Sequence, residues 1–582
     1  MNEIQKIISD AIEALYGVKI DTIELSTPPK IELGDVCYGP FLLARDLKKS
    51  PAQISTELLQ EVSKNPLIEW ANVAWPYLNL KISKNMIKNT FLELYKNQTN
   101  VAQIGAGKKV VIDYIGTNVW KVLHIAHMCT PNQGQAMINV YKKLGYDVIS
   151  DSHLWDWWII FGKLITAYKL WGNKEELEKN PVEYLHSLYI KITAETENDS
   201  SLEEKTRNEF KMLSEWNPES VELWRVFTRY SIDAMQIQLD RLWVRPDFDI
   251  WESFYEWLGL PKMGNYPDLT YNMKDIVNEL LEKWIATKND DNSVGVDFGD
   301  ESKIPSCILQ KRDGTHGYLA SDLAAIKYRK QNWNPEKILY FIDVRQKLHL
   351  EQAFEIAKRA GWIDQTQLFH AYNGFISLKD GAMSSRKGNI IKLWALLDEA
   401  EMRAEKIILE KRQDFSEVEL KKLAKIIGIW AIKYGYLSKS RTSDVIFDWD
   451  EFMTFEGNSA PYIQYAYVRW LKLLQKSWVD MTWIDLSKNS GNFSSDEEKD
   501  LIQELWNFSN ILQKTATENF PHILAGYAYG LTKKFNALYN NVHIISEENE
   551  ENKLLRLALV DLYCKILSES FAILGIEMPQ EM

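Results

Sequence analysis

Two histidines stand three residues apart in the segment His124-Ile125-Ala126-His127, which lies between a predicted strand and a predicted helix. The first N–H groups of a helix have no partner within it and favour anions, so imidazoles at such a place can contact a polyphosphate. Two other interpretations stay open. A zinc site is one, although no further ligands lie nearby in the sequence. A pair of core histidines with satisfied hydrogen bonds is the other.

A second candidate segment is a small, polar loop with two adjacent cations, and its sequence from residue 383 to 389 is MSSRKGN. Such a loop is mobile, and it could bring Arg386 and Lys387 onto a phosphate that is being transferred. The alternative is a plain surface turn, which commonly has the same composition. Neither segment identifies a reaction by itself.

These segments need a scaffold, and the sequence predicts a parallel sheet around them. Residues 109–114 and 146–150 have the character of buried strands, and residues 124–144 have the periodicity of a helix between them. Strand, helix and strand in this order form a βαβ unit, which begins a doubly wound α/β sheet. Strands resume at residues 338–342, and the mostly helical residues from about 163 to 240 are expected to be an insertion.

The two ends of the chain have different patterns. Helical periodicity at residues 4–15 and 51–62 and strand-like alternation at 77–82 predict a small α+β domain, followed by a polar, glycine-containing linker at 97–108. Nearly all of the chain from residue 396 onward has helical periodicity and predicts an all-α bundle. We therefore expect three domains, at residues 1–106, 107–395 and 396–582.

The composition is that of an ordinary globular protein. Of 582 residues, 46% are hydrophobic and 26% are charged, and no apolar stretch reaches the roughly 18 residues that a membrane helix needs. The N-terminal residues lack the basic and apolar regions of a secretory signal. The four cysteines lie far apart and form neither a CxxC metal pair nor a disulfide framework. We therefore expect a reduced, cytoplasmic protein without a bound metal of its own.

The net charge of −13, averaged over the chain, argues against nucleic acid as a partner. One stretch departs from this average, because residues 420–443 contain no acid. Its cations, together with Tyr434 and Tyr436, could contact phosphates and bases. The alternative is a solvated helix face. The cations are Lys421, Lys422, Lys425, Lys433, Lys439 and Arg441.

The two candidate segments together resemble the HIGH and KMSKS signatures of class I aminoacyl-tRNA synthetases, and further segments narrow the resemblance to arginyl-tRNA synthetases. Residues 113–124, DYIGTNVWKVLH, have the spacing of that family's stretch from an acidic residue to the first histidine of HIGH. Residues 313–322, DGTHGYLASD, and 346–349, QKLH, are similar to two more of its segments. Residues 455–466 are similar to the start of its anticodon-binding domain, and residues 28–35 to its N-terminal tRNA-binding domain. The order of the segments is that of the family along nearly the whole chain.

The resemblance implies a fold and a reaction. The fold is multidomain α/β: a Rossmann-like class I catalytic domain with a helical insertion, a small N-terminal α+β domain that binds tRNA, and a C-terminal all-α anticodon-binding bundle. The reaction is activation of L-arginine by ATP with Mg²⁺, followed by transfer to the 3′-terminal ribose of tRNA(Arg), with release of AMP and pyrophosphate. In this family, activation generally requires bound tRNA. A cytoplasmic monomer without membrane contact is expected.

The guanidinium group of arginine is a planar cation with five donors, so its site needs carboxylates and a phenol or carbonyl in one plane. By resemblance, Tyr318 and Asp322 contact it with Asp113 nearby, while Asn118 and Gln346 hold the α-amino and α-carboxylate groups. The substrate carboxylate attacks the α-phosphorus, so no side chain acts as a covalent nucleophile. By the same resemblance, the residues that bind ATP are His124, Ala126, His127, Met383, Ser384, Ser385 and Lys387. Those implied in catalysis are Lys121, His124, His127, Arg386 and Lys387. Those implied in tRNA binding are Tyr462, Gln464 and Tyr465.

Two alternative functions fit parts of the pattern. Another class I ligase, such as a cysteinyl or glutamyl enzyme, would share the two signatures. A cysteinyl enzyme needs a zinc–thiolate site, however, and the cysteines of this chain are dispersed. A catalytically inactive paralogue that binds tRNA would keep the fold without the reaction. The intact pair His124 and His127 and the cations Arg386 and Lys387 argue against it.

Tryptophan and glycine occur in abnormal numbers. The chain has 22 tryptophans against 21 phenylalanines. Its 27 glycines fall short of the roughly 41 that average usage gives. The resemblance places glycine at seven of the tryptophans and a small residue at Trp120. The seven are Trp75, Trp155, Trp158, Trp243, Trp251, Trp284 and Trp430. We hypothesise that the gene reads UGA as glycine; a genuinely tryptophan-rich paralogue is the alternative. Two smaller departures are Ala126, where HIGH has glycine, and Thr117, where the family has proline.

Overall fold

The computed structural model describes residues 2–20, 23–26, 28–256, 265–379, 391–481 and 484–582. The chain divides into two compact units. The first contains residues 1–100, 469–508 and 530–567, and the second contains residues 101–468, 509–529 and 568–582. All the candidate functional residues predicted above belong to the second unit.

The first unit is built on a four-stranded antiparallel sheet with the order β1-β2-β4-β3. Its strands are β1 (Leu25–Ser26), β2 (Val36–Tyr38), β3 (Ile68–Ala74) and β4 (Tyr77–Ile82). Its N-terminal helices are α1 (Asn2–Tyr16), α2 (Phe41–Leu47), α3 (Pro51–Val62) and α4 (Lys84–Asn97). Helix α3 begins at Pro51 because the side chain of Ser50 accepts a hydrogen bond from the N–H of Gln53. The two helices and the strand predicted in this region are confirmed.

Helices from the C-terminal part of the chain complete the first unit. They are α19 (Asp496–Trp506), most of α21 (His522–Asn541) and most of α22 (Glu550–Ile573). An ion pair joins the sheet to α19, because the buried Asp35 carboxylate contacts both Lys499 and Lys81.

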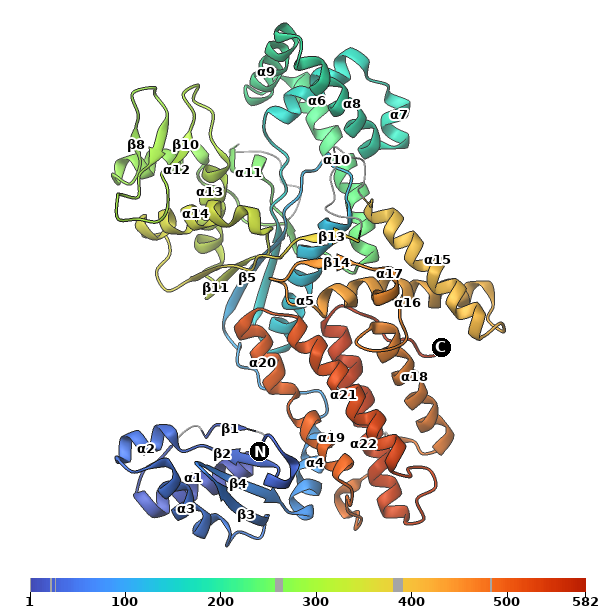
Figure 1. The fold of residues 1–582 in the computed structure, drawn as a ribbon. Coiled ribbons are helices and arrows are strands. Elements are labelled where there is room, and N and C mark those ends of the chain that lie inside the picture. The colour runs from blue at the N-terminus through green and yellow to red at the C-terminus, as the bar shows by residue number, and fades with distance from the viewer. Residues whose placement is uncertain (1, 21–22, 27, 257–264, 380–390, 482–483) are drawn as a thin grey trace. The chain divides into compact units, whose positions relative to one another are not determined.

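A five-stranded parallel sheet forms the centre of the second unit, with the order β12-β11-β5-β6-β7 (Figure 1). Its strands are β5 (Lys109–Ile115), β6 (Asp147–Ser152), β7 (Phe248–Asp249), β11 (Lys337–Tyr340) and β12 (Gln367–His370). The middle strand β5 is buried from its second residue onward, which accounts for its continuous apolar run. Helix α5 (Cys129–Lys143) connects β5 to β6. The predicted βαβ unit is therefore confirmed.

The helix after β5 begins later than predicted. Helix α5 starts at Cys129, and a short 3-10 helix, η2 (Ile125–Met128), precedes it. His124 has an extended backbone, with φ −130° and ψ 171°, and is the N-cap residue of η2. The histidine pair therefore lies in a tight turn in front of α5 and not on the helix itself.

The predicted insertion is helical, as expected. Its helices are α6 (Ile159–Trp171), α7 (Lys174–Lys179), α8 (Pro181–Thr196), α9 (Ser200–Ser214) and α10 (Pro218–Arg241). The short helix α11 (Glu252–Glu256) follows β7, and a small antiparallel sheet consists of β8 (Thr287–Lys288), β9 (Val294–Val296) and β10 (Cys307–Gln310).

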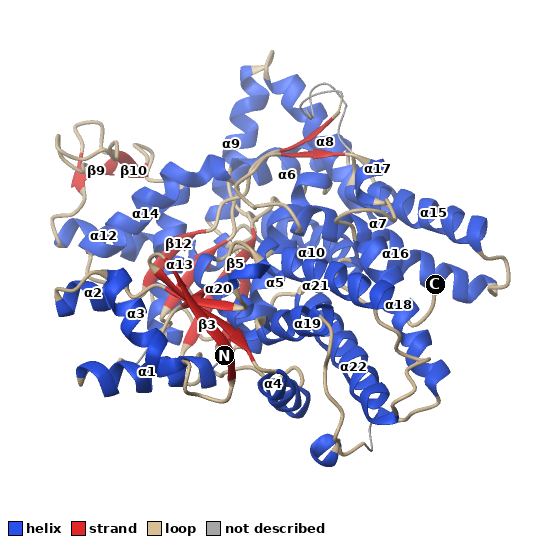
Figure 2. Cartoon of the chain, turned by 60° about the horizontal axis from the view of Figure 1, so that its bottom comes forward, coloured by secondary structure: helices blue, strands red, loops and turns tan. Residues whose placement is uncertain are grey.

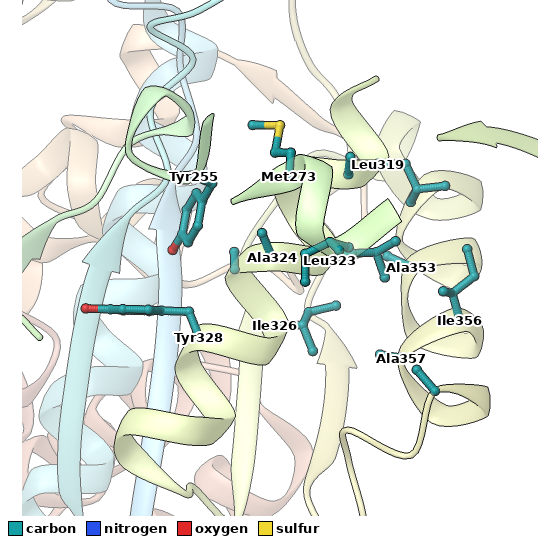
Figure 3. Close-up of a cluster of buried hydrophobic side chains, with 14 of the residues drawn as sticks. Tyr255, Met273, Leu319, Leu323, Ala324, Ile326, Tyr328, Ala353, Ile356 and Ala357 are labelled. Carbon is teal, nitrogen blue, oxygen red and sulfur yellow. The ribbon is translucent and has the colours of Figure 1, made fainter. Parts of the chain in front are cut away.

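Two of the predicted substrate contacts are carried by a helix that is anchored in a large core cluster. The cluster joins α12 (Met273–Glu282), α13 (Tyr318–Trp333) and α14 (Lys347–Arg359) (Figure 3). Leu323 of α13 lies on the side of Ala353 of α14, and Ala324 and Ile356 are buried in the same cluster. This packing fixes the direction of α13, whose first two turns carry Tyr318 and Asp322.

The C-terminal region is helical, as the periodicity predicts (Figure 2). Besides α19, α21 and α22, its helices are α15 (Leu393–Lys411), α16 (Glu417–Leu437), α17 (Trp449–Phe452), α18 (Ala460–Ser477) and α20 (Phe508–Glu518). One strand is an exception. The strand β14 (Val445–Phe447) pairs in parallel with β13 (Ile376–Leu378), which follows the five-stranded sheet in the sequence.

The acid-free stretch at residues 420–443 is largely core, so its expected nucleic-acid contacts need correction. Tyr434 and Tyr436 are buried. Lys433 is buried as well, and its ammonium donates to the backbone carbonyl of Leu242 at 2.6 Å. Neither base stacking nor phosphate binding is open to these three side chains. The exposed cations of the stretch are Lys421, Lys422, Lys425 and Lys439.

In the described part of the chain, no helix has both the length and the apolar character that a membrane crossing requires. All four cysteines are free, and Cys37, Cys129 and Cys564 are buried.

Candidate functional site

A cavity of about 740 Å³ lies at the carboxyl ends of β5 and β11, where open α/β sheets bind their ligands. Its wall consists of the residues that follow these strands, together with η2 and parts of α10 and β13. Six residues that the sequence analysis assigned to substrates line it: Asn118, Lys121, His124, Ala126, His127 and Gln346. The fold thus brings together two segments that lie far apart in the sequence.

The two histidines of this wall are bonded to each other. The backbone N–H of His124 donates to Nδ1 of His127 at 3.0 Å, and the two ring centroids are 3.9 Å apart. Burial, together with the charges of Lys121 and Arg345, lowers the pKa of His124 to about 4. Burial also holds the pKa of His127 well below its usual value. Both rings are therefore uncharged at neutral pH, and they can serve a phosphate as hydrogen-bonding groups but not as cations.

The fold adds no ligands in support of a zinc site at this pair. Within the ranges that the structure describes, no three histidine, cysteine, aspartate or glutamate side chains come close enough to hold a metal ion. Burial raises the pKa of the nearby Cys129 thiol to about 12, so it is not a ready thiolate. The histidines form a bonded pair, as the core interpretation requires, but the same pair also faces the cavity.

Lys121 and Arg345 give the cavity wall its positive charge. The guanidinium of Arg345 is held by both carboxylate oxygens of Asp343, with Nε–Oδ1 and Nη2–Oδ2 distances of 2.9 Å. Burial lowers the pKa of Lys121, and the charge of Arg345 adds to this effect. The sequence patterns did not single out Arg345, although it directly precedes Gln346 in the chain.

A cluster of acidic and aromatic side chains lies at the start of α13. The Asp322 carboxylate accepts from Nε2 of His349 at 2.5 Å, and its other oxygen is 3.6 Å from Nε2 of His153. Burial would raise the pKa of Asp322, but the two histidines and Arg329 outweigh it, so that this pKa is lowered. Tyr318 lies one turn earlier and is half-exposed. An ionised carboxylate and a phenol on one helix face are what a guanidinium site requires.

The Asp322–His349 contact predicts a pH dependence. Burial alone would lower the pKa of His349, but the hydrogen bond and charge of Asp322 raise it above 6.5. The pKa of His349 is therefore higher in the folded protein than in the unfolded chain. The stabilisation of the folded state by this contact is fully present below about pH 6.5, and it is lost as the pH rises through the folded pKa. Asp322→Asn should therefore lower the pH midpoint at which the His349 ring titrates, as followed by NMR. An unchanged midpoint would contradict the pairing.

Glu252 is a second acidic group at this site, and no role was predicted for it. It is the first residue of α11, it is buried, and one of its carboxylate oxygens accepts from Oγ of Ser321 at 3.4 Å. Burial raises the pKa of Glu252 well above its usual value, and the charge of Asp322 adds to this. A cation placed between the carboxylates of Glu252 and Asp322 would lower the pKa of Glu252, because it would offset both the burial and the charge of Asp322. A signal was present in the sequence, since Glu252 directly follows Trp251, one of the seven tryptophans at which the family has glycine.

Asp113 is bound by a cation of the protein itself, and its place near the guanidinium site stays a prediction. Arg329 of α13 donates from Nη2 to Asp113 at 2.8 Å and from Nε to Asp151 at 2.9 Å, and all three side chains are fully buried. Burial raises the pKa of both carboxyl groups, to about 6 for Asp151, while Arg329 acts in the opposite direction. The guanidinium that Asp113 binds is thus the protein's own, and this ion triad fixes α13 to β5 and β6.

Two tryptophans stand between the cavity and the acidic cluster. Trp155 lines the cavity, and its backbone N–H donates to the carbonyl of Thr117 at 3.0 Å. The ring of Trp158 lies against Tyr318, with centroids 4.3 Å apart, and its Nε1 donates to Glu252 at 2.5 Å. The indole of Trp158 therefore occupies the place between phenol and carboxylate at which a cation would bind.

The remaining predicted residues lie away from the cavity or outside the described chain. Met383, Ser384, Ser385, Arg386 and Lys387 lie outside the described residues. Gln464 is fully buried in α18, and its side-chain amide donates to the carbonyl of Glu577 at 3.0 Å, so it offers tRNA no surface. Tyr465 is half-exposed, with the ammonium of Lys411 5.5 Å from its ring centroid. Tyr462 is partly exposed on the same helix.

Three known families match the chain in succession. Residues 2–82 match the arginyl tRNA synthetase N terminal domain. Residues 90–449 match the catalytic domain of class I (R) tRNA synthetases, and residues 463–582 match the DALR anticodon binding domain.

Individual proteins give the same result over the full length. An arginine–tRNA ligase of Fusobacterium nucleatum subsp. nucleatum is 33% identical over 100% of this chain and 99% of its own. One of Clostridium botulinum is 33% identical over 99% of both. Among solved structures, the Thermus thermophilus arginyl-tRNA synthetase has a TM-score of 0.80, 20% identity and full coverage of both chains. The Plasmodium falciparum arginyl-tRNA synthetase has a TM-score of 0.80 and 21% identity over 100% of this chain and 99% of its own. These two structures support the fold described above.

Proposed function

The chain belongs to the arginyl-tRNA synthetase family, and we propose that three groups of its residues divide the work of that family. The reaction activates arginine with ATP and then transfers the arginyl group to tRNA. One group recognises the guanidinium, the second aligns ATP with the substrate carboxylate, and the third contacts tRNA. The observation that carries this division is the cavity itself, because its wall bears the cations Lys121 and Arg345. Gln346 of the same wall lies three residues before His349, which donates to the carboxylate of Asp322.

The guanidinium site consists of Tyr318, Asp322 and Glu252. Asp322 supplies a full negative charge, and Tyr318 supplies a phenol one helical turn away. Glu252 is buried beside them and has no cationic partner among the hydrogen bonds of its carboxylate, which come from Ser321 and Trp158. Bound arginine would be that partner. Asn118 and Gln346, on the cavity wall, then hold the α-amino and α-carboxylate groups.

The ATP site consists of the histidine turn and the cations of the cavity wall. His124 and His127 offer hydrogen bonds to phosphate oxygens without adding charge, and Ala126 places a methyl group at the same wall. Lys121 and Arg345 supply the positive charge. The arginine carboxylate attacks the α-phosphorus, the bond to the leaving pyrophosphate breaks, and these cations stabilise the charge that moves onto the leaving group. Mg²⁺ enters bound to the ATP phosphates, and we assign it no protein ligand.

The phosphate role of Lys121 gives a direct experiment. Lys121→Met should lower kcat for pyrophosphate exchange by about tenfold, since one charge-assisted contact is lost while Arg345 remains. The KM for arginine should stay nearly constant, because Lys121 is on the ATP side of the cavity. Lys347→Met is the matched control, since Lys347 is an exposed lysine on α14 outside the cavity lining. A raised KM for arginine with unchanged kcat would refute the assignment.

We further propose that tRNA contacts α18 through Tyr462 and Tyr465, and we omit Gln464 because it is buried.

Arg386 and Lys387 keep their proposed role at the phosphates, with Met383, Ser384 and Ser385 beside ATP. The domain limits at 106 and 395 also stay predictions. A cytoplasmic location is proposed because tRNA charging belongs with translation, and the monomeric state stays a prediction. An inactive paralogue is disfavoured, since His124, His127 and Lys121 all line one cavity.

A further inference from the structure

Among the described residues, half of those that have a positive φ and are not glycine are tryptophans. Ten described non-glycine residues have a positive φ, and five of them are Trp158, Trp216, Trp243, Trp284 and Trp478. Asparagine supplies three of the others, as is usual in this conformation, and Lys48 and Gln98 supply two. A bulky side chain at positive φ is a genuine outlier. Five outliers of one residue type require a common cause.

Three of these tryptophans terminate helices in the same manner. Trp216, Trp243 and Trp284 come two residues after the last residue of α9, α10 and α12. At Trp284, the N–H donates to the carbonyl of Leu281 and the next N–H donates to the carbonyl of Leu280, both at 3.0 Å. The other two positions have the same pair of bonds. This arrangement is the Schellman motif, whose left-handed residue is usually glycine.

The same molecule contains this motif with glycine in the left-handed position. Gly145 follows α5, Gly361 follows α14 and Gly575 follows α22, with φ values of 86°, 69° and 71°. At Gly361, the N–H donates to Lys358 at 3.0 Å, and the next N–H donates to Ala357 at 3.2 Å. The backbone at the three tryptophans is thus the backbone that this chain elsewhere builds with glycine.

Burial gives no compensating reason for an indole at the most exposed of these positions. The side chain of Trp284 is 90% exposed, and that of Trp478, just after α18, is 95% exposed. Trp216 and Trp243 are about half-exposed, and the ring of Trp243 packs edge-to-face against Trp430 with centroids 4.8 Å apart. A tryptophan that contributes to stability buries a large apolar surface, and Trp284 and Trp478 bury almost none. At these two positions, neither the backbone nor the surroundings therefore favour tryptophan.

Trp158 departs from the expected backbone still further. Its φ of 97° and ψ of 171° lie in a region that is essentially restricted to glycine. This is the residue whose indole contacts Tyr318 and Glu252. With glycine at position 158, the indole would be absent, and the acidic cluster would be open to a cation.

We propose that the protein made in its own cells carries glycine at positions 158, 216, 243, 284 and 478, and that the five codons are UGA read as glycine. Trp216 and Trp478 were not among the positions found by family resemblance, so the backbone gives an independent observation. The proposal also agrees with the composition: reading UGA as tryptophan in place of glycine raises the number of tryptophans (22) and lowers the number of glycines (27). The inference does not rest on the proposed function, because helix termini carry most of it.

Peptide mass spectrometry of the protein purified from its own cells tests this without any assumption about folding. Peptides that cover the five positions should contain glycine, and those that cover Trp224, Trp333 and Trp470, which lie inside helices, should contain tryptophan. The gene should have UGA at the first set and UGG at the second. Tryptophan at any of the five positions in the native peptides would overturn the proposal.

A stability comparison on protein expressed from the literal sequence provides a second test. Trp284→Gly should raise the thermal midpoint, because it removes a strained backbone and loses almost no burial. Trp394→Gly is the control, since Trp394 is also exposed but lies in the first turn of α15, where glycine lowers the midpoint. A lower midpoint for Trp284→Gly would count against the proposal. If the protein expressed with tryptophan at these positions fails to fold, the peptide mass spectrometry of the native protein decides between glycine and tryptophan.

Discussion

Replacing Asp322 by asparagine is expected to reduce kcat/KM for arginine by roughly thirtyfold or more. The change keeps the shape of the side chain and removes its charge, and truncating one partner of a buried charge pair costs about 2–5 kcal/mol. Asp322 is ionised in spite of its burial because His349 and His153 face it. The loss should appear in arginine-dependent pyrophosphate exchange, while the KM for ATP changes little.

A neighbouring carboxylate serves as the matched control for this substitution. Asp364 pairs with Lys330 on an exposed part of the same unit, away from the cavity lining. Asp364→Asn should leave both substrate constants unchanged. Equal kinetics for Asp322→Asn and the wild type would show that the guanidinium binds elsewhere.

Replacing Arg329 by methionine should lower the free energy of unfolding by about 3–5 kcal/mol, because two buried carboxylates would lose their cation. Arg329 contacts Asp113 and Asp151 with no exposure of any of the three side chains. The variant should also lose arginine activation even where it stays folded, since this triad fixes the helix that carries Tyr318 and Asp322. Urea denaturation and pyrophosphate exchange would measure the two effects.

Arg359→Met separates this effect from the general loss of an arginine. Arg359 lies on the adjacent helix α14 and pairs with Glu355 at the partly exposed surface. It also donates to the backbone carbonyls of Asp297 and Phe298 at 3.4 and 3.3 Å, so its loss should cost about 1 kcal/mol. A similar small cost for Arg329→Met would mean that the buried triad does not hold α13 in place.

Local sequence patterns predicted many of the helices and strands of this protein. The run of apolar residues in β5 and the Ser50-Pro51 start of α3 are local features, and the structure has both elements where the patterns put them. The start of α5 was missed, because the bond from the His124 N–H to His127 keeps the turn out of the helix. That bond depends on side-chain geometry that periodicity does not represent.

Residues that the fold brings together from distant segments were harder to find. Glu252 and Arg345 have no spacing that marks them, and they join the site only because α11 and η3 (Val344–Gln346) reach it. The ion pair of Asp113 was not predicted, because its partner Arg329 comes from a segment far along the chain. The prediction that residues 420–443 contact nucleic acid was wrong for a related reason, since composition does not say which face of α16 is buried.

Aminoacylation by the protein purified from its own cells tests the central claim most directly. The protein should attach arginine, and none of the other standard amino acids, to tRNA from the same cells. Arginine should also be the amino acid that supports ATP–pyrophosphate exchange, and this exchange should depend on added tRNA. Charging with a different amino acid, or tRNA binding without any arginine transfer, would contradict the claim.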